Sequence, residues 1–314
     1  MGTTARASIC SRFRIWLGLG KTVKTADLLR EPLSDAQCEP PNAPRLGGLM
    51  KAAWLSDIHL DFLDTAAVMR FARKVRDASP DVVLISGDIA QAPSVADHLC
   101  NLSREIMRPI YFVLGNHDYY HGSILGVRTR MKSLCGQSGG LHWLNEAGPV
   151  RLAPGTCLVG HDGWGDGRLG DFHGSRICLN DFLFIKELIG GRGDERLKRL
   201  NRLGDEAAAH FSRVVPKALA EADHVVVLTH VPPFSTAAWH DGRPCDPDWL
   251  PFFSCKAVGD VLFELMSQHP TRRMTVLCGH THGGGTSEIL PNLVTVTGAA
   301  DYGCPAIQKV YDWN

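Results

Sequence analysis

Residues 109–118 have the sequence Pro-Ile-Tyr-Phe-Val-Leu-Gly-Asn-His-Asp, in which an apolar run ends directly in a group of polar residues. The same pattern occurs at four other places, where apolar runs end at Asp57-Ile-His59, Gly87-Asp88, His230 and Gly279-His-Thr-His282. Short β-branched runs of this kind predict strands that are buried on both faces of a sheet. Since ligands bind beyond the carboxyl ends of such strands, we expect the five polar groups to meet at one rim. The pattern predicts a metal-dependent enzyme.

The composition is that of an ordinary globular protein without a charge bias. The 314 residues are 44% hydrophobic and 21% charged, and 33 Lys and Arg balance 33 Asp and Glu. A formal net charge of zero gives no support for attraction of the whole surface to nucleic acid or to an anionic membrane. A nucleic-acid partner is therefore not favoured, and no stretch approaches the ~18 apolar residues of a membrane span. Nothing in the sequence indicates an oligomeric state.

The ten cysteines are dispersed along the chain and form no Cys-x-x-Cys pair. A large chain with scattered cysteines is more often a reduced intracellular protein than a secreted, disulfide-bonded one, so we expect a cytoplasmic location. Cys278 stands next to the Gly279-His-Thr-His282 group. We interpret it as a buried strand thiol rather than a metal ligand.

The first 49 residues differ in kind from the rest. Five basic residues precede the first acid, Asp27, and a Pro-rich patch follows at 39–45. We predict a disordered extension over residues 1–49. The alternative is an organellar targeting segment, because such segments are basic and poor in acids. The folded domain is then expected to span residues 50–314.

The remaining patterns predict an α/β fold. A helix over 65–78 between strands at 51–56 and 81–86 gives a right-handed βαβ unit. Further helices are predicted at 94–107, 194–220 and 255–268, and further strands at 141–144, 156–160, 286–297 and 306–312. Pro216 is expected to kink or break the third of these helices. The predicted architecture is a four-layer α/β/β/α sandwich of two mixed β-sheets flanked by helices. The loops at about 161–193 and 231–255 are expected to face the substrate.

The ordered set of motifs is more specific than any one of them. Asp-x-His, Gly-Asp, Gly-Asn-His-Asp, His and Gly-His-Thr-His, each after an apolar strand, resemble the calcineurin-like metallophosphoesterase superfamily. The resemblance spans residues 52–314 and implies a centre of two divalent metal ions. It assigns Asp57, His59 and His282 to one ion, Asn116, His230 and His280 to the other, and Asp88 to a bridging position.

The donor types agree with a transition-metal centre. Carboxylate and amide oxygens together with imidazoles suit Mn, Fe or Zn rather than Ca. A bridging carboxylate would hold two ions roughly 3.5–4 Å apart, close enough to share and acidify one hydroxide. This hydroxide is expected to attack phosphorus in line, while the ions neutralise charge on the phosphoryl oxygens.

Other polar residues are candidates for supporting roles. His117 is predicted to face the leaving group, with Asp118 holding its imidazole in orientation. The alternative for His117 is a structural role behind the ligands. Glycines 87, 115 and 279 are expected to let the chain turn off each strand, and Gly283-Gly-Gly285 to form a flexible turn. The candidate substrate contacts are His161, Trp164, Trp239 and His240, although aromatic residues in Gly-rich loops are more often packing anchors.

Departures from relatives narrow the predicted reaction. Gly87-Asp88 is followed by Ile-Ala-Gln-Ala rather than the Val-Asp-Arg-Gly of protein serine/threonine phosphatases, so the Arg that clamps a phosphomonoester is missing. His117 stands where lipid A pathway pyrophosphatases have Arg. The phosphodiesterase-like branch remains, acting on phosphodiesters of a small or nucleotide-like substrate, with phosphomonoesters as a further class. The alternatives are a DNA or RNA nuclease on the same core and, less favoured, a non-catalytic scaffold.

Overall fold

The computed structural model describes residues 49–240 and 242–313. The predicted N-terminal extension therefore lies outside the described residues, apart from Leu49. The first strand, β1, begins at Met50, directly after this point.

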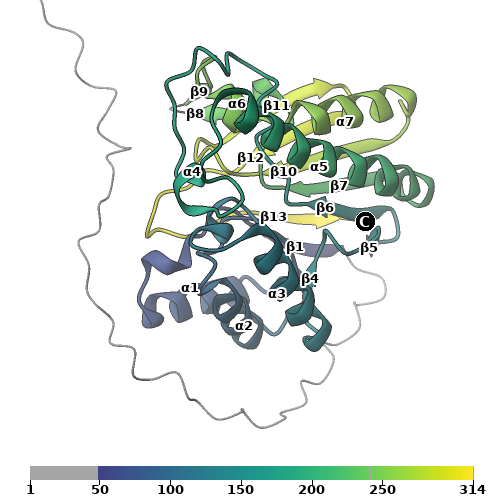
Figure 1. Cartoon of the computed structure of the whole chain (residues 1–314). Helices are drawn as coiled ribbons and strands as arrows, with labels where there is room; N and C mark the ends of the chain where they lie inside the picture. Colours follow the sequence, from purple (N-terminus) through teal and green to yellow (C-terminus); the bar gives the residue numbers. More distant parts are fainter. Residues whose placement is uncertain (1–48, 241, 314) are drawn as a thin grey trace, which may run out of the picture. The chain divides into compact units, whose positions relative to one another are not determined.

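Two mixed sheets form the centre of the described domain (Figure 1). The first sheet has the strand order β13-β1-β2-β3-β4, in which only β13 at the edge is antiparallel to its neighbour. Its strands are β1 (Met50–Leu55), β2 (Val82–Ser86), β3 (Ile110–Val113), β4 (Leu141–Trp143) and β13 (Ile307–Trp313). The parallel strands are joined by helices, as the βαβ pattern predicts.

The second sheet has the order β11-β12-β10-β7-β6-β5, with four parallel strands in the middle and an antiparallel strand at each edge. Its strands are β5 (Val150–Ala153), β6 (Thr156–His161), β7 (His224–Thr229), β10 (Arg273–Cys278), β11 (Gly285–Leu290) and β12 (Leu293–Thr297). The single strand predicted over 286–297 is therefore wrong. The chain reverses at Pro291-Asn292 because proline removes a ladder donor and both residues favour turns.

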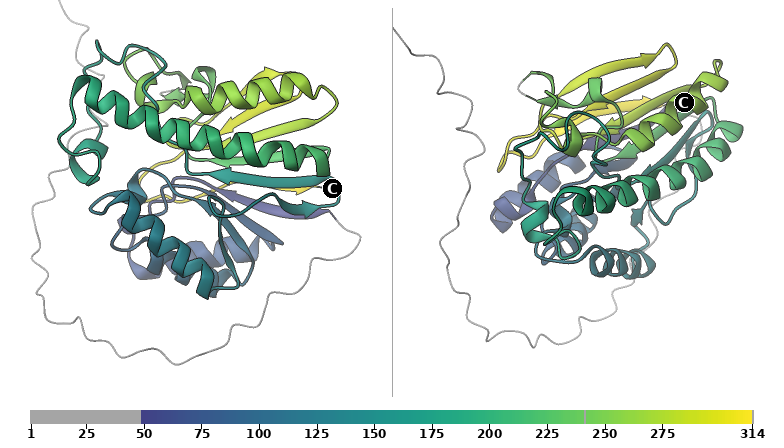
Figure 2. Two further views of the ribbon diagram at one scale, coloured as in Figure 1. Left: turned by 45° about the vertical axis from the view of Figure 1, so that its right-hand side comes forward. Right: turned by 45° about the horizontal axis from the view of Figure 1, so that its top comes forward.

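Helices cover the outer face of each sheet, which gives the predicted four layers (Figures 1 and 2). On the first sheet these are α1 (Thr65–Asp77), α2 (Val95–Ile106) and α3 (Ile124–Gln137), and on the second α5 (Gly193–Glu221) and α7 (Lys256–Gln268). α5 continues through Pro216, so a break there is wrong. Val215 and Leu219, on either side of the proline, are buried against the second sheet, and this packing offsets the lost backbone hydrogen bond.

Alternating side chains along the strands supply both faces of each sheet. In β1, Ala53 and Leu55 belong to the apolar cluster under α1, α2 and α3, whereas Ala52 and Trp54 belong to the cluster between the sheets. A third cluster joins the second sheet to α5 and α7. The prediction of strands buried on both faces is confirmed. Successive side chains point to opposite faces of the sheet, and because both faces are covered, polar residues do not alternate with apolar ones in these strands.

The two long loops carry short elements. Residues 161–193 contain α4 (Asp181–Phe184), and 231–255 contain η3 (Ser235–Ala237), the strand pair β8 (Trp239–His240) and β9 (Arg243–Pro244), and α6 (Leu250–Phe253). Two further turns, η1 (Leu60–Phe62) and η2 (His117–Tyr119), follow β1 and β3. No helix of the described residues is long and apolar enough to cross a membrane.

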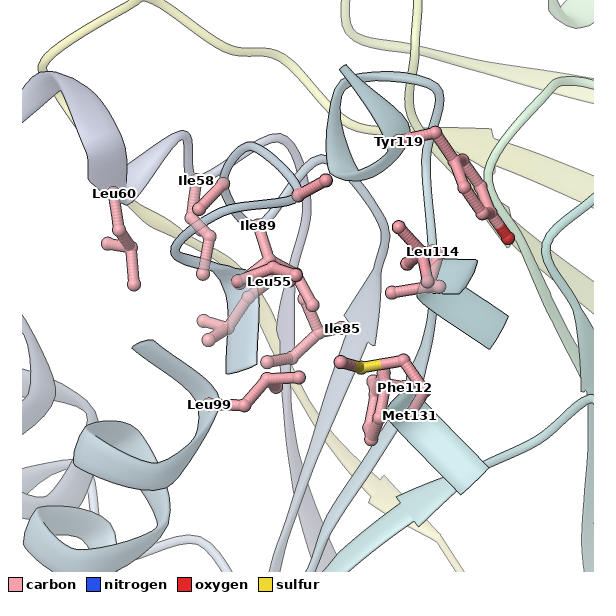
Figure 3. Close-up of a cluster of buried hydrophobic side chains, with 14 of the residues drawn as sticks. Leu55, Ile58, Leu60, Ile85, Ile89, Leu99, Phe112, Leu114, Tyr119 and Met131 are labelled. Carbon is pink, nitrogen blue, oxygen red and sulfur yellow. The ribbon is translucent and has the colours of Figure 1, made fainter. Parts of the chain in front are cut away.

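Apolar residues anchor the polar segments that follow the strands. Figure 3 shows Ile58, Leu60, Ile89 and Leu114 pointing into the cluster beneath the first sheet, together with Leu55 and Ile85 of the strands. Each of these side chains is at most 1% exposed. Since Ile58 and Leu60 alternate with Asp57 and His59, burying the apolar residues fixes the direction of the polar ones.

Candidate metal centre

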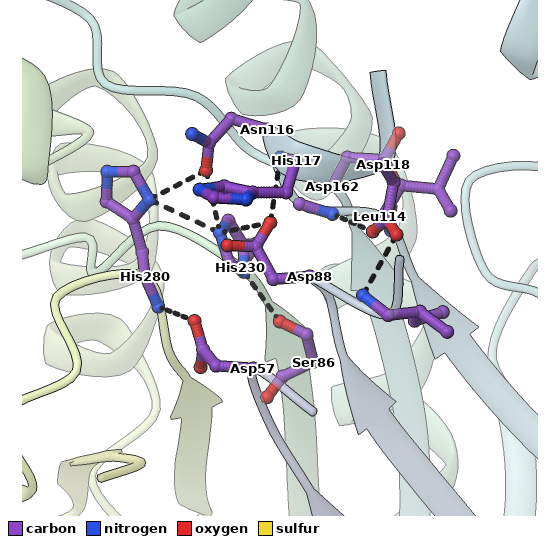
Figure 4. Close-up of polar contacts among 12 residues, drawn as sticks. Asp57, Ser86, Asp88, Leu114, Asn116, His117, Asp118, Asp162, His230 and His280 are labelled. Atoms are coloured by element: carbon purple, nitrogen blue, oxygen red, sulfur yellow. Dashed lines mark hydrogen bonds and ion pairs between the residues drawn. The ribbon is translucent and has the colours of Figure 1, made fainter. Parts of the chain in front are cut away.

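The predicted ligand side chains meet at one rim, beyond the carboxyl ends of β1, β2, β3, β7 and β10. Figure 4 labels Asp57, Asp88, Asn116, His230 and His280 of this set. One group contains Asp57, His59, Asp88 and His282, whose ligand atoms all lie within 4.8 Å of one another. The Nε2 atoms of His59 and His282 are 3.1 Å apart. Asp57 Oδ1 is 3.6 Å from His282 Nε2. Four donors at this spacing are close enough to bind one cation.

A second group lies beside the first. Asn116 Oδ1 is 3.2 Å from His230 Nε2 and 3.0 Å from His280 Nδ1, and these two nitrogens are 3.2 Å apart. Asp88 lies between the groups, with Oδ1 3.3 Å from His230 Nε2 and Oδ2 3.7 Å from His59 Nε2. The two oxygens of one carboxylate therefore face two separate sets of donors.

Hydrogen bonds on the outer ring nitrogens determine which atom of each imidazole faces inward. His230 Nδ1 is 2.9 Å from the carbonyl oxygen of Ser86, and His280 Nε2 is 3.1 Å from that of Phe252. A carbonyl can only accept, so these nitrogens carry the protons, and the inward nitrogens present lone pairs. This is the arrangement of metal-binding histidines. Lone pairs 3.2 Å apart repel, and a cation between them would relieve the repulsion.

The backbone at the ligands is strained. The described chain has eight non-glycine residues with positive φ, and five of them are the predicted ligands Asp57, His59, Asp88, His280 and His282. Left-handed backbone is costly for residues with a Cβ and persists where the surrounding structure enforces it, typically at functional sites. The concentration at these five positions supports a functional role for the cluster.

Glycines next to the ligands leave space for carboxylates. A Cβ on Gly115 would lie 2.1 Å from Asp88 Oδ1, and one on Gly279 would lie 2.0 Å from Asp57 Oδ2. Of the three glycines predicted to be needed for turns, only Gly87 has a positive φ, of 93°. Gly115 and Gly279 are therefore needed for close approach rather than for backbone conformation.

Buried charge in the cluster favours cations. Burial, together with the nearby charges of Asp57 and Asp118, raises the pKa of Asp88 well above its usual range. Burial also lowers the pKa of His59, His230 and His280, which keeps their rings neutral. Without a cation, the buried carboxylates repel one another and the neutral imidazoles do not offset their charge. Ionised carboxylates and neutral imidazoles are, however, the donors that a divalent transition metal needs. The residues present fit a metal centre.

Two aspartates that support the ligands were not predicted. Asp162 is 1% exposed and follows β6; its Oδ1 accepts from Leu114 N–H (2.7 Å), and its carbonyl accepts from His230 N–H (3.0 Å). Asp181 of α4 accepts from Asn116 Nδ2 at 2.8 Å. Asp162 could have been found, because it too follows an apolar run. Asp181 lies in a loop without a periodic signal.

Serines support Asp57 from behind. Ser56 Oγ donates to Asp57 Oδ2 at 2.5 Å, Ser86 Oγ to Ser56 Oγ at 2.7 Å, and the Trp54 indole to Ser86 Oγ at 3.0 Å.

Cys278 is fully buried in β10, and burial raises the pKa of its thiol to about 12. A protonated thiol in a strand agrees with its interpretation as a core residue.

Asp118 does not orient His117 as predicted. Its Oδ1 accepts from the N–H groups of Ile89 and Ala90, both at 2.9 Å, and its Oδ2 from Gly115 N–H at 2.8 Å. His117 Nδ1 has no hydrogen-bond partner among the described residues. The reason is geometric: η2 turns the chain after Asn116, so that the carboxylate of Asp118 points back into the protein. Asp118 instead joins the segments after β2 and β3.

His117 lies beside the centre, with its ring centroid 4.7 Å from that of His59 and its ring stacked on Tyr120 at 4.3 Å. It is partly exposed. The surrounding protein removes part of the ring, including Nδ1, from water, and this desolvation, followed by the charges of His282 and His230, lowers the pKa of His117 to about 3. Its backbone N–H donates to Asp88 Oδ1 at 2.9 Å.

The four candidate substrate contacts divide into two pairs. His161 and Trp164 are each only 4% exposed; His161 packs against His210 under α5, and Trp164 packs against Tyr119 in the core. Both rings are enclosed by neighbouring aromatic rings and do not face the candidate metal centre's solvent side, so neither is a substrate contact in this structure.

Trp239 and His240 are partly exposed and lie near the last ligand segment. The Trp239 indole covers Gly285, where a Cβ would lie 2.3 Å from Cε2, so this glycine makes room for the ring. His240 Nδ1 is 3.4 Å from the carbonyl oxygen of Thr281. Both positions remain candidates for contact with a substrate.

Residues 50–284 match the family model for the calcineurin-like phosphoesterases. The chain belongs to this family. The match covers all seven ligand positions, and this calcineurin-like phosphoesterase contains the Asp and His cluster in which members of the family bind metal.

Curated relatives of this phosphoesterase match over part of their length. The present chain is 29% identical over 159 residues to an uncharacterized metallophosphoesterase, Cj0846, from Campylobacter jejuni. This match covers 46% of the present chain and 39% of the Campylobacter protein. The chain is 30% identical over 128 residues to a transmembrane protein with a metallophosphoesterase domain from Danio rerio, covering 37% of this chain and 28% of the relative. The chain thus matches well under half the length of each.

Solved structures agree with the fold. Phosphopantetheinyl hydrolase from Mycobacterium tuberculosis aligns with a TM-score of 0.61 at 14% identity, over 82% of this chain and 91% of that one. A dimetal phosphatase from Danio rerio aligns with a TM-score of 0.50 at 14% identity, over 80% and 88%. At this identity the likeness supports the predicted sandwich fold alone.

Proposed function

We propose that the protein is a dinuclear metal-dependent phosphoesterase that hydrolyses phosphodiesters, and also phosphomonoesters, of a small or nucleotide-like substrate. The observation that carries this proposal is the position of Asp88 between two groups of donors, each able to bind a cation. The family match limits the reaction to phosphoester chemistry. A phosphopantetheinyl hydrolase and a dimetal phosphatase share the fold, and their names are compatible with a phosphoester substrate and a pair of metal ions.

Each residue of the cluster has a role in this proposal. Asp57, His59 and His282 would hold one cation, Asn116, His230 and His280 the other, and Asp88 would contact both. The bound ions would supply Lewis acidity toward the phosphoryl oxygens and acidify water. The serine chain behind Asp57 and the carbonyl oxygens behind His230 and His280 hold the donors in place before substrate arrives.

His117 would act on the leaving group. Its ring lies against His59 and is partly exposed, so it can reach a substrate bound to the centre. Its role would be to donate a hydrogen bond to the departing oxygen. The stacking contact with Tyr120, rather than a carboxylate, would hold the ring in this position.

A nuclease is the second candidate and has less support. A protein that neutralises several phosphates needs a concentration of Lys and Arg, whereas this chain has equal numbers of basic and acidic residues. Steep loss of oligonucleotide binding with increasing salt would favour the nuclease.

The test is Asp88→Asn, measured by elemental analysis and by turnover of bis(p-nitrophenyl) phosphate and p-nitrophenyl phosphate after loading with Mn. The wild type is expected to bind two ions per chain and to hydrolyse the diester. The variant is expected to bind less metal, because each cation loses a shared negative ligand. Its turnover is expected to fall by at least about 10²–10³-fold, because charge on the phosphoryl group is then less well stabilised. Asp97→Asn, at an exposed position of α2, is the matched control. A wild type that binds two ions but hydrolyses neither ester would contradict the proposal.

A further inference from the structure

Two exposed aromatic side chains border the metal centre. Phe62 of η1 is 51% exposed, and Tyr302, in the segment between β12 and β13, is 43% exposed. Their ring centroids are 4.8 Å apart, with the ring planes inclined at 43°. They come from opposite ends of the described chain and meet beside the segment that follows β1.

Tyr302 contacts the ligands directly. Its ring centroid lies 4.6 Å from that of His59 and 5.0 Å from that of His282, and 6.1 Å from that of His117. Phe62 is 6.0 Å from His59, edge to face. The two rings therefore form a surface that starts at the ligands of one predicted cation and continues into solvent. We call this pair the aromatic wall.

Packing alone explains the aromatic wall poorly. Neither ring belongs to the three apolar clusters of the described domain. With both rings against it His59 is 1% exposed, yet 51% of Phe62 and 43% of Tyr302 remain open to solvent. Large aromatic side chains that remain exposed beside a cluster of functional groups are typical of binding surfaces.

The surroundings of the wall are acidic. Asp61 precedes Phe62, and Asp301 precedes Tyr302 and is exposed. Asp61 Oδ1 is buried without a hydrogen-bond partner among the described residues. Carboxylates accept hydrogen bonds from hydroxyl and amino groups and repel further phosphates. The wall is therefore suited to a neutral planar group that carries donors, rather than to a polyanionic strand.

We infer that Phe62 and Tyr302 bind the organic group of the phosphoester by stacking, and that this group is a planar ring of the nucleobase or aryl type. This inference rests on the proposed function, since it places the esterified phosphate at the metal centre. It limits the substrate class to phosphoesters whose ring can reach the wall while the phosphate contacts the cations. Base–aromatic stacking changes affinity by about 5- to 150-fold per ring.

The test compares two ligands that differ only in the base. They are the phosphonate analogues of AMP and of ribose 5-phosphate, in which a methylene group replaces the ester oxygen and prevents hydrolysis. Binding to the Mn-loaded full chain is measured by calorimetry. The wild type is expected to bind the adenosine compound about 5- to 150-fold more tightly. Tyr302→Leu is expected to remove most of this ratio, and Tyr302→Phe to keep it. Metal content, measured in parallel, reports whether the centre is intact.

Phe263→Leu is the matched control, because Phe263 is also exposed, at 46%, on α7. It should leave the ratio unchanged. Equal affinities in the wild type, or an unchanged ratio in Tyr302→Leu, would overturn the inference. The outcomes separate the two proposals. Turnover of phosphoesters without a preference for the adenosine compound would contradict only the inference that the aromatic wall binds a planar ring. A preference for that compound in a protein that hydrolyses no phosphoester defeats only the proposed function.

Discussion

Asn116 has a side-chain amide with two chemically different ends, and its neighbours decide which end faces the cluster. Nδ2 donates to Asp181 Oδ1 at 2.8 Å, and it lies 3.1 Å from Tyr120 Oη, which itself donates to Asp181 at 2.8 Å. An ionised carboxylate accepts hydrogen bonds but cannot donate them, so Asp181 binds the NH₂ end of the Asn116 amide. The carbonyl end is left facing His230 and His280, where the proposed second cation would need a ligand. Asp181 is thus a positioning residue for Asn116.

Replacing Asp181 by Ala is expected to reduce metal affinity and turnover by about 10–100-fold, the usual effect of removing a group that orients a ligand. The amide of Asn116 would then be free to rotate. Metal titration followed by kcat and KM measurements checks this. Asp181→Asn keeps an acceptor oxygen and should recover part of the loss. Asp194→Ala, at a position 81% exposed, is the control, and an equal effect in both alanine variants would argue against a positioning role.

At the scale of elements, the ligand segments are held by close backbone approach. Asp57 N–H donates to the carbonyl oxygen of Gly87 (3.1 Å), and His280 N–H donates to Asp57 Oδ1 (2.8 Å). The segments after β1 and β2 are therefore joined backbone to backbone, and the segment after β10 is joined to them through the Asp57 carboxylate. Gly279 makes this possible, because any Cβ there would enter the Asp57 carboxylate.

Gly279→Ala is expected to lower the free energy of unfolding by about 1–3 kcal/mol or more, as overpacking of a rigid site does. It should also displace Asp57 and reduce metal binding. Urea denaturation and elemental analysis measure both effects. Gly136→Ala is the matched control: Gly136 lies inside α3 with nothing within 4 Å of an added Cβ. Alanine there should raise stability by about 0.5–1 kcal/mol. A tolerated Gly279→Ala would show that the ligand segments can separate.

The sequence predicts those features that repeat a local pattern. β1, β2, β3, β7 and β10 each place ligands at a predicted strand end, because a buried strand must be apolar and its end is the first position open to polar groups. Asp118 accepts from backbone N–H groups rather than holding His117, and Trp164 is the packing anchor that its loop also allowed, since a motif gives no side-chain direction. Asp181 and Tyr302 could not be predicted, because their positions depend on how irregular segments fold over the rim.

At the scale of the whole molecule, the centre lies where the two sheets meet, and polar contacts join them there. His230 follows β7 of the second sheet, and its Nδ1 atom is 2.9 Å from the carbonyl oxygen of Ser86 in β2 of the first sheet. Asp162, after β6, accepts from Leu114 N–H after β3. The predicted ligands come from both sheets. Bound cations would therefore act as a further connection between the two halves of the sandwich.

Removal of metal with a chelator is expected to lower the midpoint of thermal unfolding. Cations that bind the native state alone stabilise it by about 4 kcal/mol when their free concentration is 1,000 times Kd. Calorimetry with added Mn and with chelator measures the difference. The same comparison in Asp88→Asn should give little change, because that variant is expected to bind metal poorly. Identical midpoints for the wild type under both conditions would contradict binding across the sheets.

The first sheet has a further consequence for synthesis of the chain. β1, which leads into Asp57 and His59, pairs with β2 on one side and with β13, the last described strand, on the other. During translation, the side of β1 that β13 covers stays open until almost the entire domain has left the ribosome. An exposed strand edge can pair with other chains. The nascent domain thus has an open strand edge next to Asp57 and His59 until β13 pairs with β1.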